Sequence, residues 1–306
     1  MTSALRQLSA TTWAWVQDST DWGFSNAGVV SSQGVSLLFD TQFTLDATRA
    51  MLHEIDEATA GSAIRTVVTS HQNGDHSWGN QLLPEAEIIT SRASAEHMCH
   101  EITPEQLTAL SHAKGVDSTS RYAARHFGNF DFSGITVTGP TRTFTVREEM
   151  TVGGVTVELI DLGPGHSAGD VALHLPQDGI VFAGDVLFQG GHMIVWSGSL
   201  AACVESVDAL LATEADVFVP GHGQLMERAE VVDFRGYLTD VQEAAVAYAR
   251  DGLPLDRAAA RVHAEFAGSL AHPERLFTAT AGAYADAGAM GALQNVELVK
   301  GMADLA

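Results

Sequence analysis

Histidines and aspartates able to ligate a metal ion follow directly after apolar, β-branched runs at four places in this 306-residue chain. These residues are His71, Asp75, His76, His166, Asp185 and His222. Strand ends hold polar side chains at one edge of a sheet, and neighbouring glycines let the backbone and a solute approach closely. The pattern therefore predicts a site at a sheet edge where these side chains meet.

The residue types indicate a transition metal, because imidazole and carboxylate suit zinc, iron or manganese. His71, Asp75 and His76 fall within six residues, so one tight loop can point all three inward. No cysteine lies near them, which favours an open site that keeps a water molecule over a Cys-rich structural zinc site. A single histidine after a strand usually caps or lies on the surface, but four such clusters are hard to explain by structure alone.

The elements that must position these residues are short strands alternating with helices. Apolar runs divided by glycine and serine predict strands over 12–16, 27–31, 35–40, 64–69 and 88–89. Apolar spacing predicts a helix over 44–60, with Leu45, Met51, Leu52 and Ile55 on one face and Thr48 beside them, and a second helix over 75–83.

The second half repeats this interleaving. Strands are predicted over 143–146, 150–152 and 155–161 as an antiparallel meander with a Gly153-Gly154 turn, and further strands over 171–175, 180–183 and 217–219, with a helix over 200–212. Interleaved strands and helices predict an α/β fold in which two sheets pack together with helices outside.

We expect residues 1–225 to form this layered domain, with a helical insert at about 91–130. Residues 226–306 are predicted to be a helical extension on the same domain. Its apolar stripe contains Phe234, Leu238, Val241, Ala245 and Tyr248. If exposed, that stripe would serve equally well as a homodimer interface.

Composition narrows the classes of partner. The formal net charge of −22 disfavours nucleic acid and anionic membranes. The start lacks the apolar core of a signal peptide, and no run approaches the roughly 20 apolar residues of a membrane span. We therefore expect a cytoplasmic protein that acts on a small molecule. Cys99 and Cys203 are too few for a disulfide framework and leave one bridge open.

The sequence resembles the metallo-β-lactamase superfamily. The matching elements are His71-Gln72-Asn73-Gly74-Asp75-His76, His166 after Gly163-Pro164-Gly165, Asp185 in Phe182-Ala183-Gly184-Asp185, and His222 in Val219-Pro220-Gly221-His222-Gly223. They occur in the family's order over roughly residues 10–225. The resemblance implies an αββα sandwich with a one- or two-metal site at its edge.

The resemblance also implies how the ligands divide. A first metal would be held by His71, position 73 and His166, and a second by Asp75, His76 and His222, with Asp185 bridging them. The sequence departs from the family at Asn73, where histidine is usual. An amide oxygen is a weaker ligand for a zinc-like ion than imidazole. One metal at the second site, two metals with a labile first one, or binding too weak for hydrolysis all remain open.

Metal chemistry of this kind predicts a hydrolase. A bound ion lowers the pKa of water toward ~7 and polarises a carbonyl, and Asp75 could orient that water. We expect one or two divalent ions, with zinc as the first choice and iron or manganese as alternatives. The predicted substrate is an ester, thioester or lactone. The alternative functions are a polyketide cyclase or thioesterase, as in actinobacterial relatives, and a metal-poor, non-hydrolytic binding member.

Aromatic residues near the expected mouth of the site predict an apolar or aromatic substrate. Trp22 and Phe24 lie in a Gly/Asn loop, and His192 and Trp196 follow the Asp185 loop. These four are the predicted substrate-binding residues. Nuclease members of the family carry extra domains and basic surfaces, flavoprotein members an appended domain, and β-lactam hydrolases are usually exported. None of these features is evident in the sequence.

Overall fold

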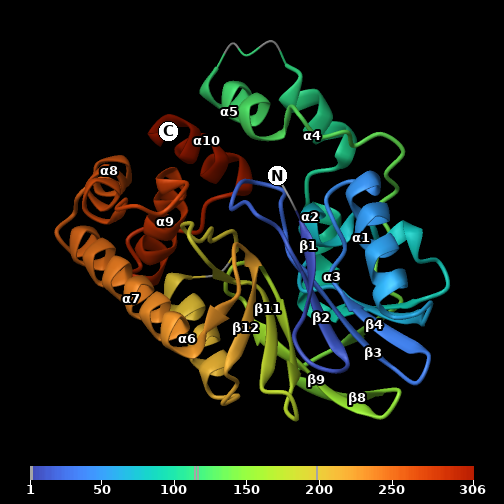
Figure 1. The fold of residues 1–306 in the computed structure, drawn as a ribbon. Coiled ribbons are helices and arrows are strands. Elements are labelled where there is room, and N and C mark those ends of the chain that lie inside the picture. The colour runs from blue at the N-terminus through green and yellow to red at the C-terminus, as the bar shows by residue number, and fades with distance from the viewer. Residues whose placement is uncertain (1–2, 114, 116, 198) are drawn as a thin grey trace.

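The computed structural model describes residues 3–113, 115, 117–197 and 199–306. Two mixed β-sheets pack face to face, and helices cover both outer faces (Figure 1). A further group of helices lies across one end of the two sheets (Figure 1). The α/β sandwich predicted from the sequence is confirmed.

The first sheet has seven strands, in spatial order β1 to β7. Their bounds are β1 (Ala4–Gln7), β2 (Thr12–Val16), β3 (Ala27–Ser32), β4 (Val35–Phe39), β5 (Ala63–Val68), β6 (Glu87–Ser91) and β7 (Arg142–Phe144). Strands β1 to β4 pair antiparallel, and β4 to β7 pair parallel. The parallel half needs crossover connections, and α1 (Leu45–Ala58) supplies the first.

The second sheet has six strands, in the order β13-β12-β11-β10-β9-β8. Their bounds are β8 (Arg147–Val152), β9 (Val155–Gly163), β10 (Asp170–Leu175), β11 (Ile180–Phe188), β12 (Val217–His222) and β13 (Met226–Glu227). Only β11 and β12 pair parallel within it, and α6 (Leu200–Leu211) forms their crossover. Strands β8 and β9 form the predicted hairpin through Gly153 and Gly154.

Three apolar cores hold the layers together. One lies between the sheets and includes Leu37, Val68, Leu159, Val171 and Phe182. A second packs α1 on the first sheet, and a third packs α6 and α7 (Arg228–Arg250) on the second sheet. Alternate residues of β4 belong to opposite cores, which is the pattern of a strand buried on both faces.

Helix α1 illustrates how the sequence sets an element. The Thr44 side chain caps its first turn by accepting a hydrogen bond from the amide of Ala47, at 3.1 Å. Leu45, Thr48, Met51 and Ile55 are buried as predicted, and Leu52 is half-buried. The apolar face thereby fixes α1 against the sheet.

Two predicted elements differ from the structure. The predicted helix over 75–83 is one short turn, α2 (Gly74–Ser77), followed by a 3-10 turn at Asn80–Leu82. A Cβ at Gly79 would lie 2.2 Å from Thr48 Oγ1, so the chain passes close against α1 just after α2 ends. The predicted strand over 143–146 is β7, which pairs with β6 in the first sheet and is not part of a meander. Exposed Val146, with φ of 68°, marks the crossing between the sheets.

The helical insert consists of α3 (Arg92–His97), a 3-10 turn at Met98–His100, α4 (Pro104–Ser111) and α5 (Ser118–Phe127). Residues 114 and 116 of the predicted insert lie outside the described residues. Thr103 and Gln106 form a reciprocal capping box that starts α4. Leu107 of the insert packs in a small core with Phe43, Trp78 and Phe132, which come from outside the insert.

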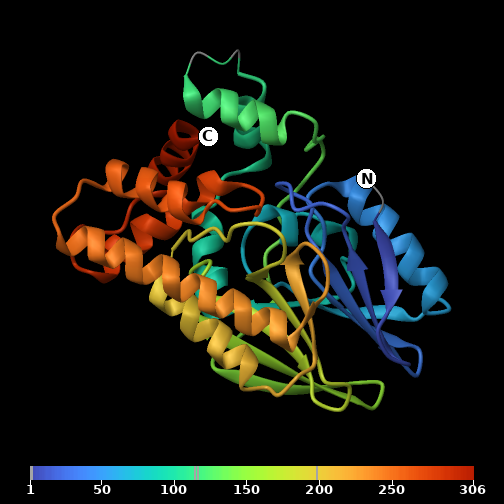
Figure 2. The same cartoon turned by 60° about the vertical axis from the view of Figure 1, so that its left-hand side comes forward.

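The C-terminal part continues with α8 (Leu255–Phe266), a 3-10 turn at Pro273–Arg275, α9 (Leu276–Asp286) and α10 (Asn295–Leu305). Figure 2 shows α7 alongside α6 on the second sheet. The predicted stripe on α7 is therefore not an exposed interface, because Phe234, Leu238 and Val241 are buried in the chain's own core.

Helix α10 turns back and packs on α5 of the insert, as both ribbon views show (Figures 1 and 2). Ser118 on α5 donates a hydrogen bond to Asp304 on α10. The insert and the C-terminal helices therefore meet above the end of the sandwich. No described helix is long and apolar enough to cross a membrane. Cys99 is exposed and Cys203 is buried, and neither forms a disulfide.

Candidate metal centre

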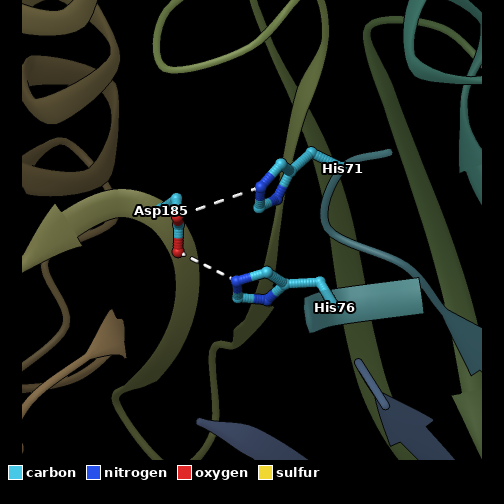
Figure 3. Close-up of side chains that lie close together, drawn as sticks. All are labelled: His71, His76 and Asp185. Atoms are coloured by element: carbon cyan, nitrogen blue, oxygen red, sulfur yellow. Dashed lines mark ion pairs between the residues drawn. The ribbon is translucent and has the colours of Figure 1, made fainter. Parts of the chain in front are cut away.

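The predicted ligands come together at one end of the sandwich, where strand ends and short turns hold them. His71 follows β5, Asp75 and His76 lie in α2, His166 lies between β9 and β10, Asp185 lies on β11, and His222 ends β12. All except Asp75 are at least 95% buried. Figure 3 shows His71 and His76 pointing toward the Asp185 carboxylate from one side.

One group of ligand atoms is formed by His71, Asn73, His166 and Asp185. Asn73 Oδ1 lies 3.0 Å from His71 Nε2 and 3.1 Å from His166 Nε2. Asp185 Oδ2 lies 3.3 Å from His166 Nε2 and 3.9 Å from His71 Nε2. Ligand atoms of a tetrahedral zinc ion lie about 3.3–3.6 Å apart, given bonds of about 2.0–2.2 Å. The measured distances of 3.0–3.9 Å bracket this spacing, so these side chains lie close enough together to surround one ion.

A second group is formed by Asp75, His76, Asp185 and His222. Asp185 Oδ1 lies 3.1 Å from His76 Nε2 and 3.4 Å from His222 Nε2. Asp75 Oδ2 lies 3.4 Å from His222 Nε2 and 3.9 Å from His76 Nε2. The two oxygens of Asp185 therefore face different groups, as a bridging carboxylate requires.

Two buried atoms of this centre, His76 Nε2 and Asp185 Oδ1, form no well-aligned hydrogen bond among the described residues, although they lie 3.1 Å apart as an ion pair. A buried polar atom without a partner is costly, so this pair fits a site for a cation. The glycine before His222 makes the approach possible, since a Cβ on Gly221 would lie 1.9 Å from Asp185 Oδ1. The donor set and its geometry fit divalent transition metals.

The outer nitrogen of each imidazole is held by a neighbour. His76 Nδ1 lies 2.8 Å from Asp40 Oδ2, His166 Nδ1 2.9 Å from the Ile194 carbonyl, and His222 Nδ1 3.0 Å from the Phe24 carbonyl. Such contacts fix the ring and leave Nε2 free to ligate. Sequence reasoning missed Asp40, although an aspartate ending the strand over 35–40 could have indicated it.

The electrostatics of the centre are those of a site made for positive charge. Burial opposes ionisation of Asp75, but attraction to His76 and His222 lowers its pKa to about 2. Burial likewise opposes protonation of His222, but Asp185 and Asp75 raise its pKa to about 9. Burial and the nearby His76 and His166 hold the pKa of His71 well below its ordinary value.

Asn73 is held by the insert. Its Nδ2 donates a hydrogen bond to Glu101 Oε2 at 3.1 Å, and Gln72 Nε2 donates to Glu101 Oε1 at 3.2 Å. The pKa of Glu101 lies above its ordinary value, because the effect of burial exceeds that of the two hydrogen bonds, which act to lower it. With its NH₂ group engaged, the amide presents its oxygen to His71 and His166. Glu101 was missed because it is distant in sequence and outside any recognisable motif.

The centre lies in the wall of a cavity of about 640 Å³, within the range of small-molecule sites. The insert and the C-terminal helices supply much of its lining, including Leu107, Tyr122, Phe127, Val296 and Val299. Trp22 and Trp196, both predicted to bind substrate, line this cavity and contact each other, with ring centroids 6.1 Å apart.

Two other predicted substrate residues lie elsewhere. The ring of Phe24 packs on Phe130, and Phe24 contributes its carbonyl to His222 instead. His192 is fully buried, with Nδ1 2.6 Å from Tyr237 Oη and Nε2 3.1 Å from the Ala267 carbonyl. Backbone bonds to Ala271 turn its side chain toward the C-terminal helices, where burial lowers its pKa to about 4.

Comparisons with known proteins agree with this architecture. The sequence profile described as the Metallo-beta-lactamase superfamily matches residues 20–222. A 2,4-dinitroanisole O-demethylase subunit alpha from Nocardioides sp. (strain JS1661) is 24% identical over 213 residues, or 69% of this chain and 56% of that protein. A hydroxyacylglutathione hydrolase from Brucella ovis is 35% identical over 173 residues, or 56% and 53%. The chain thus spans about half the length of these relatives.

Solved structures share the fold at low identity. A metallo-β-lactamase from Pontibacter korlensis superposes with a TM-score of 0.58 at 20% identity, covering 78% of this chain and 99% of that one. A double mutant of the sec-alkyl sulfatase PisA1 superposes with a TM-score of 0.70 at 18% identity, covering 93% of this chain and 50% of that one. The second likeness therefore extends into the C-terminal helices.

Proposed function

This chain belongs to the metallo-β-lactamase superfamily, and on that premise we propose that it is a metal-dependent hydrolase of a carbonyl-containing small molecule. The substrate class is an ester, thioester or lactone with a bulky apolar or aromatic body. One observation carries the proposal, namely two groups of ligand atoms that share Asp185 in the wall of a cavity of about 640 Å³.

The residues divide the work between them. His71, Asn73, His166 and Asp185 would hold one divalent ion, and Asp75, His76, Asp185 and His222 the other. When bound, such ions lower the pKa of a water molecule and polarise a carbonyl oxygen. We assign zinc first, with iron or manganese as alternatives.

Asp75 is the catalytic residue of this proposal. Its side chain is 17% exposed, against 5% for Asp185, and it lines the cavity. The low pKa of Asp75 keeps its carboxylate ionised, so an oxygen can accept a hydrogen bond from the attacking water. The aromatic rings of Trp22 and Trp196 would exclude solvent and hold an apolar acyl or aryl group beside it.

The relatives support a hydrolase activity in general, but their names indicate different substrates. By their names, one group hydrolyses a hydroxyacylglutathione and another removes a methyl group from an aromatic ether oxygen. A polyketide cyclase or thioesterase is the alternative that the apolar cavity also fits. A metal-poor, non-hydrolytic protein is the alternative that Asn73 raises.

The test is reconstitution of chelator-treated protein with zinc, iron or manganese. We expect at least one equivalent of metal by elemental analysis, and hydrolysis of an aryl ester, a thioester or a lactone that the chelator abolishes. Less than about 0.3 equivalents with every metal would favour the non-hydrolytic alternative, because a site with this many ligands should be filled. Full metal loading with cyclisation but no hydrolysis would favour the cyclase.

A further inference from the structure

Arg275 is a buried cation in the wall of the cavity that contains the metal centre. It ends the 3-10 turn Pro273–Arg275 and is 1% exposed. Among the described residues that line the cavity it is the one arginine or lysine. The same cavity is lined by Asp75 and Asp185, whose charges act on Arg275, and by the predicted substrate residues Trp22 and Trp196.

The hydrogen-bonding capacity of Arg275 is mostly unused. Nη1 donates to the His192 carbonyl at 3.2 Å, while Nε is buried with no partner in the described part of the chain. No carboxylate of the described residues lies within 4.0 Å of its guanidinium. A guanidinium has five N–H donors, so one hydrogen bond leaves most of the fork unsatisfied.

The neighbouring acid, Glu274, forms its side-chain hydrogen bonds with two other side chains and not with Arg275. Glu274 Oε1 accepts a hydrogen bond from Tyr122 Oη at 2.9 Å and lies 3.3 Å from His272 Nδ1. A purely structural role for Arg275 would rest on stacking, because its Cζ lies 4.5 Å from the Trp22 ring centroid and 5.7 Å from that of Phe188. Stacking accounts for the faces of the guanidinium, and the His192 carbonyl accounts for one N–H on its edge, which leaves Nε and the other N–H groups without a hydrogen-bond partner among the described residues.

We infer that Arg275 binds a carboxylate of the substrate, so that the substrate is an aromatic or similarly flat apolar molecule carrying one acidic group. This inference rests on the proposed function, because it places the acid and the reacting carbonyl in one cavity. A planar carboxylate matches the guanidinium fork with two parallel hydrogen bonds.

The experiment compares molecules that differ only in the acidic group. Binding of 2-naphthoate and 2-naphthamide to the zinc-loaded protein is measured by calorimetry. Hydrolysis of 6-acetoxy-2-naphthoate and its carboxamide is measured in parallel. We expect the acid to bind about tenfold to a hundredfold more tightly than the amide, the range for hydrogen bonds to a charged group. In Arg275→Met this ratio should fall to near one, and Arg275→Lys should keep part of it.

Arg235→Met is the matched control, because Arg235 pairs with Asp208 on the surface and lies outside the cavity lining. It should keep the full preference for the acid. Equal binding of acid and amide by the unaltered protein would overturn the inference, and so would a preference that survives in Arg275→Met, since the carboxylate would then be held by the metal. If Arg275→Met does not fold, Arg275→Lys and the acid–amide comparison in the unaltered protein decide.

The two proposals fail in different ways. The protein could bind 2-naphthoate preferentially through Arg275 and hydrolyse neither acetoxy ester. That result would support carboxylate binding by Arg275 and reject ester hydrolysis. Hydrolysis of both esters with equal KM would sustain the hydrolase and reject the anion site.

Discussion

The two walls of the cavity are built in opposite ways. One wall consists of strand ends and tight turns of the sandwich, where imidazoles and carboxylates stand 3.1–3.9 Å apart. The other is formed by the helical insert and the C-terminal helices, which supply mainly apolar rings and aliphatic side chains. We therefore expect the strand-end wall, called the edge, to determine catalysis and the helical wall, called the cap, to determine substrate choice. Mutations in the edge and in the cap should then have separate effects.

The largest effect is expected from the edge. His222→Ala removes an imidazole that the remaining carboxylates cannot replace, so affinity for the second metal should fall by at least about a hundredfold. Competition with a chromophoric chelator measures the change. His53→Ala, at an exposed histidine on α1, is the control and should bind metal normally. Unchanged affinity in His222→Ala would show that the edge does not hold the metal as described.

Asn73→His tests the difference between the two groups of metal ligands at the sheet edge. Restoring an imidazole should raise affinity for the first metal by about tenfold, because imidazole is a stronger donor than an amide oxygen. Metal stoichiometry at limiting free zinc should move toward two. If the occupancy of the first metal site does not change, the amide oxygen of Asn73 is not a weaker ligand than imidazole at this position. If activity falls while metal binding tightens, the asparagine serves a different coordination chemistry.

Trp196→Ala tests the aromatic lining of the cavity that comes from the loop between β11 and α6. Losing part of a half-buried indole should cost about 1 kcal/mol, or about a fivefold rise in KM for a bulky aromatic ester. Metal content should not change, and a small polar ester should hardly respond. Loss of metal, or equal damage with both esters, would make Trp196 a structural residue and join the two walls into one unit.

The smallest effect is expected at Glu101, through which the helical insert contacts Asn73 of the metal centre. Glu101→Gln keeps a hydrogen-bond acceptor for Asn73 but removes the charge, so affinity for the first metal should fall by about threefold. Cobalt titration followed by absorption can resolve the two sites. Glu105→Gln, at an exposed position of α4, should behave like the unaltered protein. An equal loss at both sites would argue against a local link between the insert and Asn73.

The edge could be predicted from the sequence because each ligand is fixed by its own short element. His71, Asp185 and His222 each follow an apolar run whose strand end determines where the side chain lies. The same local logic failed at 143–146, because a strand's composition does not encode which sheet it joins. It also failed at His192, where backbone bonds to Ala271 set the direction of the side chain.

The cap could be predicted only in outline. Helical periodicity indicates the insert and the C-terminal helices, but not that α10 packs on α5 or which residues face the metals. Glu101 and Arg275 acquire their roles from tertiary contacts with Asn73 and Trp22, which are far away along the chain. No local pattern distinguishes them from surface charges.

The hydrogen bonds that join the Phe24 loop to the end of β12 bear on the order of folding. The Phe24 carbonyl and His222 Nδ1 are 198 positions apart in sequence, and Asn26 Nδ2 reaches the Pro220 carbonyl across 194. Contacts this distant form late, because closing so long a loop costs entropy before any contact compensates. A nascent chain can offer His71, Asp75 and His76 to an ion from one short stretch. We therefore expect His222 to join only after the sheets have docked, so that an ion captured early would be held loosely until the fold is complete.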